Sequence, residues 1–228
     1  MAKPGFDADA LISMFENASA RGSTKLQAAV EQATLSALQG RELTLKNIRG
    51  TLDAVTQAVS EGAARNVAGV DASGLLDKAV AGMDAALLKA VQANRAALQQ
   101  FVDRGADLRE KHLKQALEDL DKFEDALIGA VRKAAGDAGP LAAPWQQLME
   151  KLQAGGTLSG TSAATTVEQF ASQLQDGLRS SRTVGLRAAQ ALAEGYAAMA
   201  SGVLVGMMSA LEQAGGASAQ AKPAPKKR

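Results

Sequence analysis

Apolar residues recur along most of this chain at intervals of three and four, which is the period of an amphipathic helix. The clearest run lies in residues 42–65, where the apolar side chains are Leu45, Ile48, Leu52, Val55 and Val59. Their spacing of 3, 4, 3 and 4 keeps one seam turned toward a partner helix, as in a coiled coil. We therefore predict a helix over 42–65 and interpret these five residues as a seam between the chains of a homo-oligomer.

Similar stripes predict helices on either side of this one. Asp7 or Asp9 can cap a short first helix, and Ser23 can cap a second that stops near Gly40. A further stripe runs from 73 to 135 and is interrupted at Gly105. As one continuous helix it would be about 95 Å long at 1.5 Å per residue, so either Gly105 bends it or the protein is elongated.

The remainder of the chain divides by composition. Residues 136–140 end the long stripe, and Trp145 anchors a short helix that follows. The uncharged Gly, Ser and Thr residues of 154–166 predict a flexible linker, after which Thr165 and Glu168 have the spacing of a capping box. The expected organisation is a long-helix bundle region (1–135), a loop with a short helix (136–153), the linker (154–166), an apolar C-terminal helix (167–213) and a disordered tail (214–228).

The prolines agree with a helical chain, because proline removes a backbone donor and clashes with the preceding turn of a helix. All five lie outside two long stretches, 5–139 and 145–222. The predicted fold is therefore all-α, an elongated bundle of long, coiled-coil-like helices with a disordered basic tail. With one Trp, one Tyr and five Phe in 228 residues, such helices have little with which to shape a deep pocket, which favours a coat, scaffold or spacer over an enzyme.

Charge and cysteine usage narrow the expected environment and partners. The net charge is +1, and Lys222, Lys226, Lys227 and Arg228 contribute +4, so residues 1–221 carry −3. The four tail cations can make a weak polyanion contact, whereas a bulk nucleic-acid binder carries a basic face on its folded part. The chain has no cysteine and no signal-peptide pattern near its start, so we expect a cytoplasmic protein.

The sharpest candidate for a binding segment is Gly195–Leu211, seventeen residues without a charge. This run is short for a spanning helix, which needs about 20 apolar residues, so no integral membrane insertion is expected. It can be a buried packing helix, or its apolar face can adsorb to a lipid-like or polymer surface, where pliable methionines suit an irregular partner. That face consists of Met199, Val203, Leu204, Met207 and Met208.

No residue pattern indicates catalysis, a cofactor or a metal. His112 is the single histidine and is accompanied by no nucleophile pattern and no second ligand, so we interpret it as a helix-surface or seam residue. The carboxylates between Glu118 and Asp125 follow neither a calcium-loop pattern nor a di-iron pattern, and we interpret them as a solvated face.

In composition and in the order of its segments, the chain resembles the phasins, bacterial proteins that coat polyhydroxyalkanoate storage granules. The features that carry the resemblance are the coiled-coil-like stretches (45–59 and 76–131), the weakly apolar helix and the AKPAPKKR tail. The resemblance implies helices that lie on the polymer with their Leu, Val and Met faces down, and charged faces that keep granules dispersed. It also implies oligomerisation through the heptad segment.

The sequence leaves two classes of function open. The first is a non-enzymatic protein on a granule or other hydrophobic surface, and the second is a self-associating helical scaffold or adaptor whose stripes are satisfied within its own bundle or a homo-oligomer. Free apolar faces distinguish the first class from the second.

Overall fold

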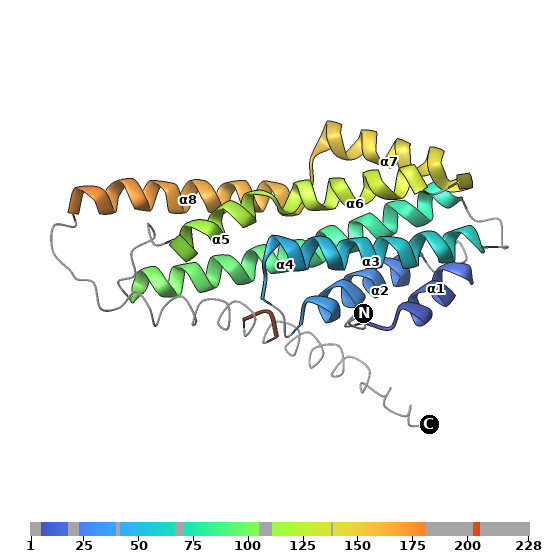
Figure 1. The fold of residues 1–228 in the computed structure, drawn as a ribbon, viewed down its shortest axis with the longest axis horizontal. Coiled ribbons are helices and arrows are strands. Elements are labelled where there is room, and N and C mark those ends of the chain that lie inside the picture. Colours follow the sequence, from blue (N-terminus) through green and yellow to red (C-terminus); the bar gives the residue numbers. More distant parts are fainter. Residues whose placement is uncertain are drawn as a thin grey trace, which may run out of the picture.

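A computed structural model describes residues 6–17, 23–39, 42–66, 71–104, 111–137, 139–180 and 203–205 of the 228. These residues form helices joined by short connections, with no strand among them (Figure 1). The all-α fold expected from the sequence is confirmed. The helices are α1 (Ala8–Glu16), α2 (Ser23–Leu38), α3 (Leu45–Ala64), α4 (Ala72–Asp103), α5 (Lys111–Asp121), α6 (Phe123–Asp137), a 3₁₀ turn η2 (Gly139–Leu141), α7 (Ala142–Gly155) and α8 (Leu158–Ser180).

Three of these helices begin at residues whose side chains cap them locally. The first backbone N–H groups of a helix have no partner within it, and a side-chain oxygen just before the helix can accept from one of them. Asp7 accepts from the Ala10 N–H at 3.0 Å, Thr44 from the Asn47 N–H at 3.4 Å, and Asp71 from the Ser73 N–H at 3.1 Å. Of the two caps that the sequence allowed for the first helix, Asp7 is the one observed, and Asp9 lies in the first turn.

The long stripe of 73–135 does not form one helix. It is divided among α4, α5 and α6, and α5 and α6 return along α4 in the opposite direction (Figure 1). Folding back lets the apolar faces of these helices meet one another, whereas a straight helix would leave its stripe exposed to water. The chain reverses its direction between α4 and α5, and Gly105, the residue at which a bend was expected, lies outside the described residues.

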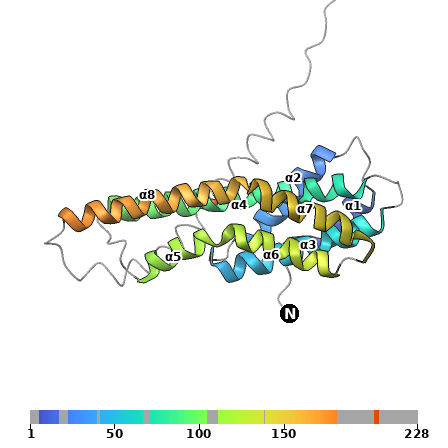
Figure 2. The same cartoon turned by 90° about the horizontal axis from the view of Figure 1, so that it is seen from above.

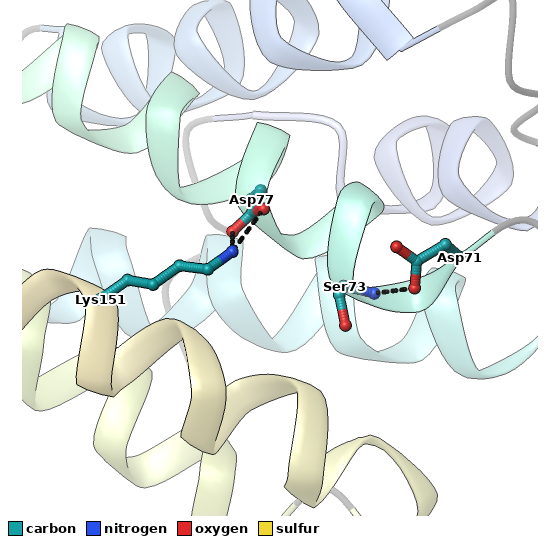
Figure 3. A network of polar contacts seen from close by, with 4 residues as sticks. All are labelled: Asp71, Ser73, Asp77 and Lys151. Atoms are coloured by element: carbon teal, nitrogen blue, oxygen red, sulfur yellow. Dashed lines mark hydrogen bonds and ion pairs between the residues drawn. The ribbon is translucent and has the colours of Figure 1, made fainter.

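The helix α4 is the central element of the bundle. Its 32 residues extend over about 48 Å at 1.5 Å per residue. The helices α2, α3 and α7 pack against it, and α8 lies along its second half, running in the same direction (Figures 1 and 2). Close to the α7 contact, Lys151 binds both carboxylate oxygens of Asp77 at 3.0 and 3.2 Å, while Asp71 caps the start of α4 (Figure 3).

One continuous hydrophobic core joins the described helices. It includes residues from every helix, among them Phe15, Phe101, Phe123, Trp145 and Phe170, none of them more than 2% exposed. Trp145 is fully buried, as expected for the anchor of α7. The segments that we expected as separate organisational units thus share a core, at least in the residues that the structure describes.

The predicted flexible linker at 154–166 is wrong. Only Gly156 and Thr157 separate α7 from α8, and α8 begins at Leu158 rather than near Thr165. Gly156 has a φ of 66°, a value that glycine adopts without strain, and its N–H closes the last turn of α7 on the Leu152 carbonyl at 2.8 Å. This run of Gly, Ser and Thr is helical because carboxylates of α4 and α6 bind the backbone N–H groups at its start. The predicted disordered tail (214–228) lies outside the described residues.

Candidate functional site

Two residues of the predicted surface-binding face lie within the described residues, and both pack against the bundle. Leu204 is fully buried and belongs to the hydrophobic core, and Val203 is half-buried against that core. Met199, Met207 and Met208 lie outside the described residues. In this structure Leu204 is therefore covered by the protein itself and is not presented to a surface.

The predicted oligomer seam lies inside the chain. Ile48, Leu52, Val55 and Val59 are fully buried, and Leu45 is half-buried against the core. The helix that carries them, α3, packs against α1, α2, α4 and α6 of its own chain. Contact with a second chain through this seam would require the bundle to open, and homo-oligomerisation stays a prediction.

Other predicted features fall partly or wholly outside the described residues. The tail cations Lys222, Lys226, Lys227 and Arg228 lie outside them, and so does the side chain of His112, whose backbone is in α5. Among the helices that the structure describes, none is long and apolar enough to cross a membrane. The described His, Asp and Glu residues include no group of three or more that could hold a metal ion.

A buried polar junction forms where α4 and α6 meet the first turn of α8. We call it the α8 junction and define it by Asp84, Glu124, Thr157, Ser159 and Gly160. Asp84, only 8% exposed, accepts from the backbone N–H groups of Leu158 and Ser159, each at 3.0 Å. Both oxygens of this α4 carboxylate thus bind N–H groups that α8 itself cannot pair, and the negative charge lies at the positive end of the helix dipole.

Glu124 of α6 completes the α8 junction. Its Oε1 accepts from the Thr157 N–H at 2.8 Å and from the Thr157 hydroxyl at 2.9 Å, while that hydroxyl oxygen accepts from the Gly160 N–H at 2.9 Å. Gly160 lies so close that an added Cβ would be 2.3 Å from the Glu124 carboxyl carbon. The absence of a side chain at 160 is what lets α8 approach α6.

A third carboxylate caps the start of another helix that is distant in the sequence. Asp119 of α5 accepts from the Leu45 N–H at the start of α3 at 3.1 Å, and its other oxygen accepts from the Gln115 side chain at 2.8 Å. The interpretation of the 118–125 carboxylates as a solvated face is therefore wrong for Asp119 and Glu124. Nothing local in the sequence links these residues to their partners, although Thr157, three residues before Gly160, has the type and spacing of a helix cap and could have been recognised.

A groove of about 640 Å³ lies between α3 and α6. Its walls are small residues, Gly50 and Ala54 on α3 and Ala130 and Ala134 on α6. Lys133 at the rim binds Asp53 across the groove at 2.9 Å, and this hydrogen bond and the charge of Asp53 raise the pKa of Lys133 above its ordinary value of 10.5. Lys133 therefore stays protonated at neutral pH and cannot act there as an amine nucleophile or base.

A family model described as "Family of unknown function (DUF6781)" matches residues 1–213. No curated protein and no solved structure matches the chain.

Proposed function

The chain belongs to the DUF6781 family, whose function is unknown, and we propose that it is a non-enzymatic, phasin-like protein that attaches to hydrophobic storage granules in the cytoplasm. In this proposal the Gly195–Leu211 run contacts the polymer and the helical bundle stays in the surrounding water. Self-association and a weak polyanion contact through the basic tail accompany this role.

The observation that carries the proposal is the uncharged 195–211 run, since the apolar stripes of the described helices pack inward. Among the described residues, the large apolar side chains that remain exposed are Met14, at 40%, and Leu158, at 69%. A surface of polar and charged residues interrupted by single apolar ones is normal for a protein in water. Adsorption to an apolar surface therefore falls to the uncharged 195–211 run, which carries a high density of pliable methionines.

This packing narrows what the phasin resemblance implies. Helices lying on the polymer with their Leu, Val and Met faces down would need those faces to be free. The faces of α3 and α4 point into the core instead. We accordingly assign attachment to the C-terminal run and dispersal of the granules to the charged outer surface of the bundle.

We propose a non-enzymatic protein partly because of the side chains that line the groove between α3 and α6. Its polar lining consists of carboxylates, hydroxyls, one amide and Lys133, which is held as an ammonium by Asp53. An amine that stays protonated cannot act as a nucleophile, so the proposal gives Lys133 and this groove no catalytic role.

A soluble helical scaffold or adaptor is the second candidate function. The burial of Leu204 within the core and the location of the α3 seam inside one chain favour it. If the whole 195–211 run packs as Leu204 does, the free protein has no apolar face with which to bind a granule.

Binding to artificial granules of amorphous poly(3-hydroxybutyrate) tests the proposal. Charge at two positions of the run, in the variant Val203→Asp/Met207→Asp, should reduce the sedimented fraction about ten-fold, because an ionised carboxylate resists transfer out of water. The matched control is Gln92→Asp/Gln147→Asp, which adds the same charge at two exposed positions of α4 and α7 and should bind like the unmodified protein.

Helix content of both variants, measured by circular dichroism, shows whether the bundle stays folded. Equal granule binding by the two variants would remove the 195–211 run as the contact. No granule binding by the unmodified protein would favour the scaffold.

A further inference from the structure

We propose that a second copy of this chain docks on the outer side of α3 and α6, over the groove between them, in an antiparallel two-fold arrangement. We call this surface the α3–α6 face, and its centre is formed by the groove residues Gly50, Ala54, Ala130 and Ala134. The inference rests on the self-association in the proposed function and gives it a surface other than the α3 seam, which is buried inside the chain.

Two glycines of the α3–α6 face are the first observation. At Gly62 and Gly82, which lie inside helices, an added Cβ would be 2.5 Å from a backbone carbonyl oxygen of a neighbouring helix. At Gly50 of α3 and Gly129 of α6, also inside helices, an added Cβ would meet no atom within 4 Å. Glycine destabilises a helix interior relative to alanine, and the contacts within the described chain do not explain that cost at these two positions. Close approach by another backbone from outside would explain it.

The groove gives a second chain room at the same place. Gly50 lines it, and Gly129 lies four residues before the rim residue Lys133, on the same side of α6. The helices α3 and α6 lie side by side and run in the same direction (Figures 1 and 2). The distance at which two helices pack depends on the side chains at their contact, so the small residues on both walls let a third helix come close.

The charges on the α3–α6 face change sign along its length. Lys46 and Arg49 are exposed and lie four residues before two groove residues of α3, which places both cations at the start of the face. Glu61 of α3 and Asp137 of α6 line the other end of the groove. Because the two helices are parallel, one end of the face is basic and the other is acidic.

An antiparallel two-fold arrangement brings unlike ends together twice. The basic end of each copy then lies opposite the acidic end of its partner, whereas a parallel arrangement would place like charges together, which is unfavourable. Arg65 lies 3.8 Å from Glu61 and reduces the charge of the acidic end without cancelling it. In the middle of the face, Lys133 and Asp53 pair within each copy. The charges therefore fit a second copy of the same chain through an interface that uses the same patch twice.

The size of the face indicates how tightly two copies bind. The helix α6 has 15 residues and is about 22 Å long, and two helices side by side are about 20 Å wide. Two such faces bury on the order of 900 Å² together, which is close to the lower limit for a specific interface. We therefore expect a weak dimer, with a Kd on the order of 10–100 µM.

Charge reversal at the two ends of the face provides the test, in the full chain. The variants Lys46→Glu/Arg49→Glu and Glu61→Lys/Asp137→Lys each have two ends of like sign, so for each of them alone the Kd should rise about ten-fold or more. Mixed in equal amounts, the two variants should associate again, because every end then faces an unlike one. Sedimentation velocity up to about 500 µM, well above the expected Kd, measures the mass.

Two controls accompany the charge reversals. Lys25→Glu/Arg95→Glu makes the same change of charge as the first variant at exposed positions of α2 and α4, and it should dimerise like the unmodified protein. Helix content, measured by circular dichroism, should be the same in all variants. Association of the two mixed variants also shows that both are folded.

A steric variant tests the glycines without changing any charge. Gly50→Gln/Gly129→Gln adds two long side chains where the partner's backbone should lie, and glutamine favours the helix, so this variant should stay folded and become monomeric. The matched control is Ala28→Gln/Ala164→Gln, at exposed positions of α2 and α8, which should still dimerise.

The outcomes separate this inference from granule binding. An unmodified protein that is monomeric at every concentration overturns the inference and the self-association together, leaves another protein as the occupant of the face, and does not affect the granule test of the 195–211 run. Dimerisation of the glutamine variant and of both charge variants overturns the choice of face. Charge variants that stay monomeric when mixed, or a mass above that of a dimer, overturn the antiparallel two-fold arrangement.

Discussion

Two pairs of helices approach so closely that one methyl group decides whether they fit. A Cβ added at Gly62 of α3 would lie 2.5 Å from the Ile12 carbonyl oxygen of α1. One added at Gly82 of α4 would lie 2.5 Å from the Gln27 carbonyl oxygen of α2. Both obstacles are backbone atoms, which cannot rotate away as a side chain can. These glycines set the distances between α1 and α3 and between α2 and α4.

We predict that Gly82→Ala lowers the free energy of unfolding by about 1–3 kcal/mol, because the added methyl group forces α2 and α4 apart. Gly50→Ala and Gly129→Ala are matched controls in helices, where the added Cβ meets no atom within 4 Å. They should raise stability by up to about 1 kcal/mol through helix propensity. Urea unfolding followed by the fluorescence of Trp145 measures all three, and a Gly82 variant as stable as the controls would contradict the close approach.

The carboxylate of Asp84 is specified by a contact 74 residues away in the chain. Both of its oxygens accept hydrogen bonds, so a replacement must accept twice in the same positions. Asparagine can accept only through its single oxygen, and its NH₂ group would face a backbone N–H.

We predict that Asp84→Asn lowers the free energy of unfolding by about 1–3 kcal/mol, since one buried donor loses its acceptor. Asp121→Asn, at an exposed position in the last turn of α5, is the control and should change stability by less than about 0.5 kcal/mol. Both values come from the midpoint and slope of urea unfolding. Equal stability of the two variants would mean that the α8 junction does not hold the helix.

The helices α3 and α8 are held in the bundle by different kinds of contact. The stripe of α3 is aliphatic and lies against four helices of the same chain, so hydrophobic burial places it. The buried positions of α8 before Phe170 are small or polar, and capping carboxylates from α4 and α6 hold its first turn. The α3 stripe can be recognised from spacing alone, but its partner helix cannot, because an inward seam and an interchain seam have the same sequence pattern.

We predict that Leu52→Ala lowers the free energy of unfolding by about 2–5 kcal/mol, the usual cost of a cavity left by a fully buried leucine. The loss should be independent of protein concentration, because Leu52 packs within one chain. Urea unfolding at two concentrations 50-fold apart measures this, with light scattering to give the mass. A midpoint that rises with concentration, together with dissociation of the variant, would place the seam between chains after all.

At the scale of the whole molecule, the described helices form one bundle with an apolar interior. Burial of the large apolar side chains in a single core favours cooperative unfolding. The long central α4 and the returning α5 and α6 give the bundle its elongated form (Figure 1). The described part of the chain is therefore one preformed body and not a set of separate amphipathic helices.

We predict that the free protein unfolds in one cooperative transition and binds little of a hydrophobic dye such as ANS, since its large apolar side chains are mostly buried. Circular dichroism and Trp145 fluorescence should give coincident transitions. Strong dye binding with a broad melt would indicate that the apolar faces are open in solution, as helices lying flat on a polymer would require.

The sequence by itself determined the all-α fold and the seam residues of α3, and it limited the cap of α1 to Asp7 or Asp9. These depend on the spacing of apolar residues and on a capping side chain next to its helix, which are local properties of the chain. Only the tertiary structure decided that the 73–135 stripe folds back, that the α3 seam faces its own chain and that residues 158–166 are helical. Each of these features depends on contacts between segments that are distant in the sequence. Asp84 and Glu124, for example, accept hydrogen bonds from N–H groups more than thirty residues away. A local sequence pattern contains no information about such contacts.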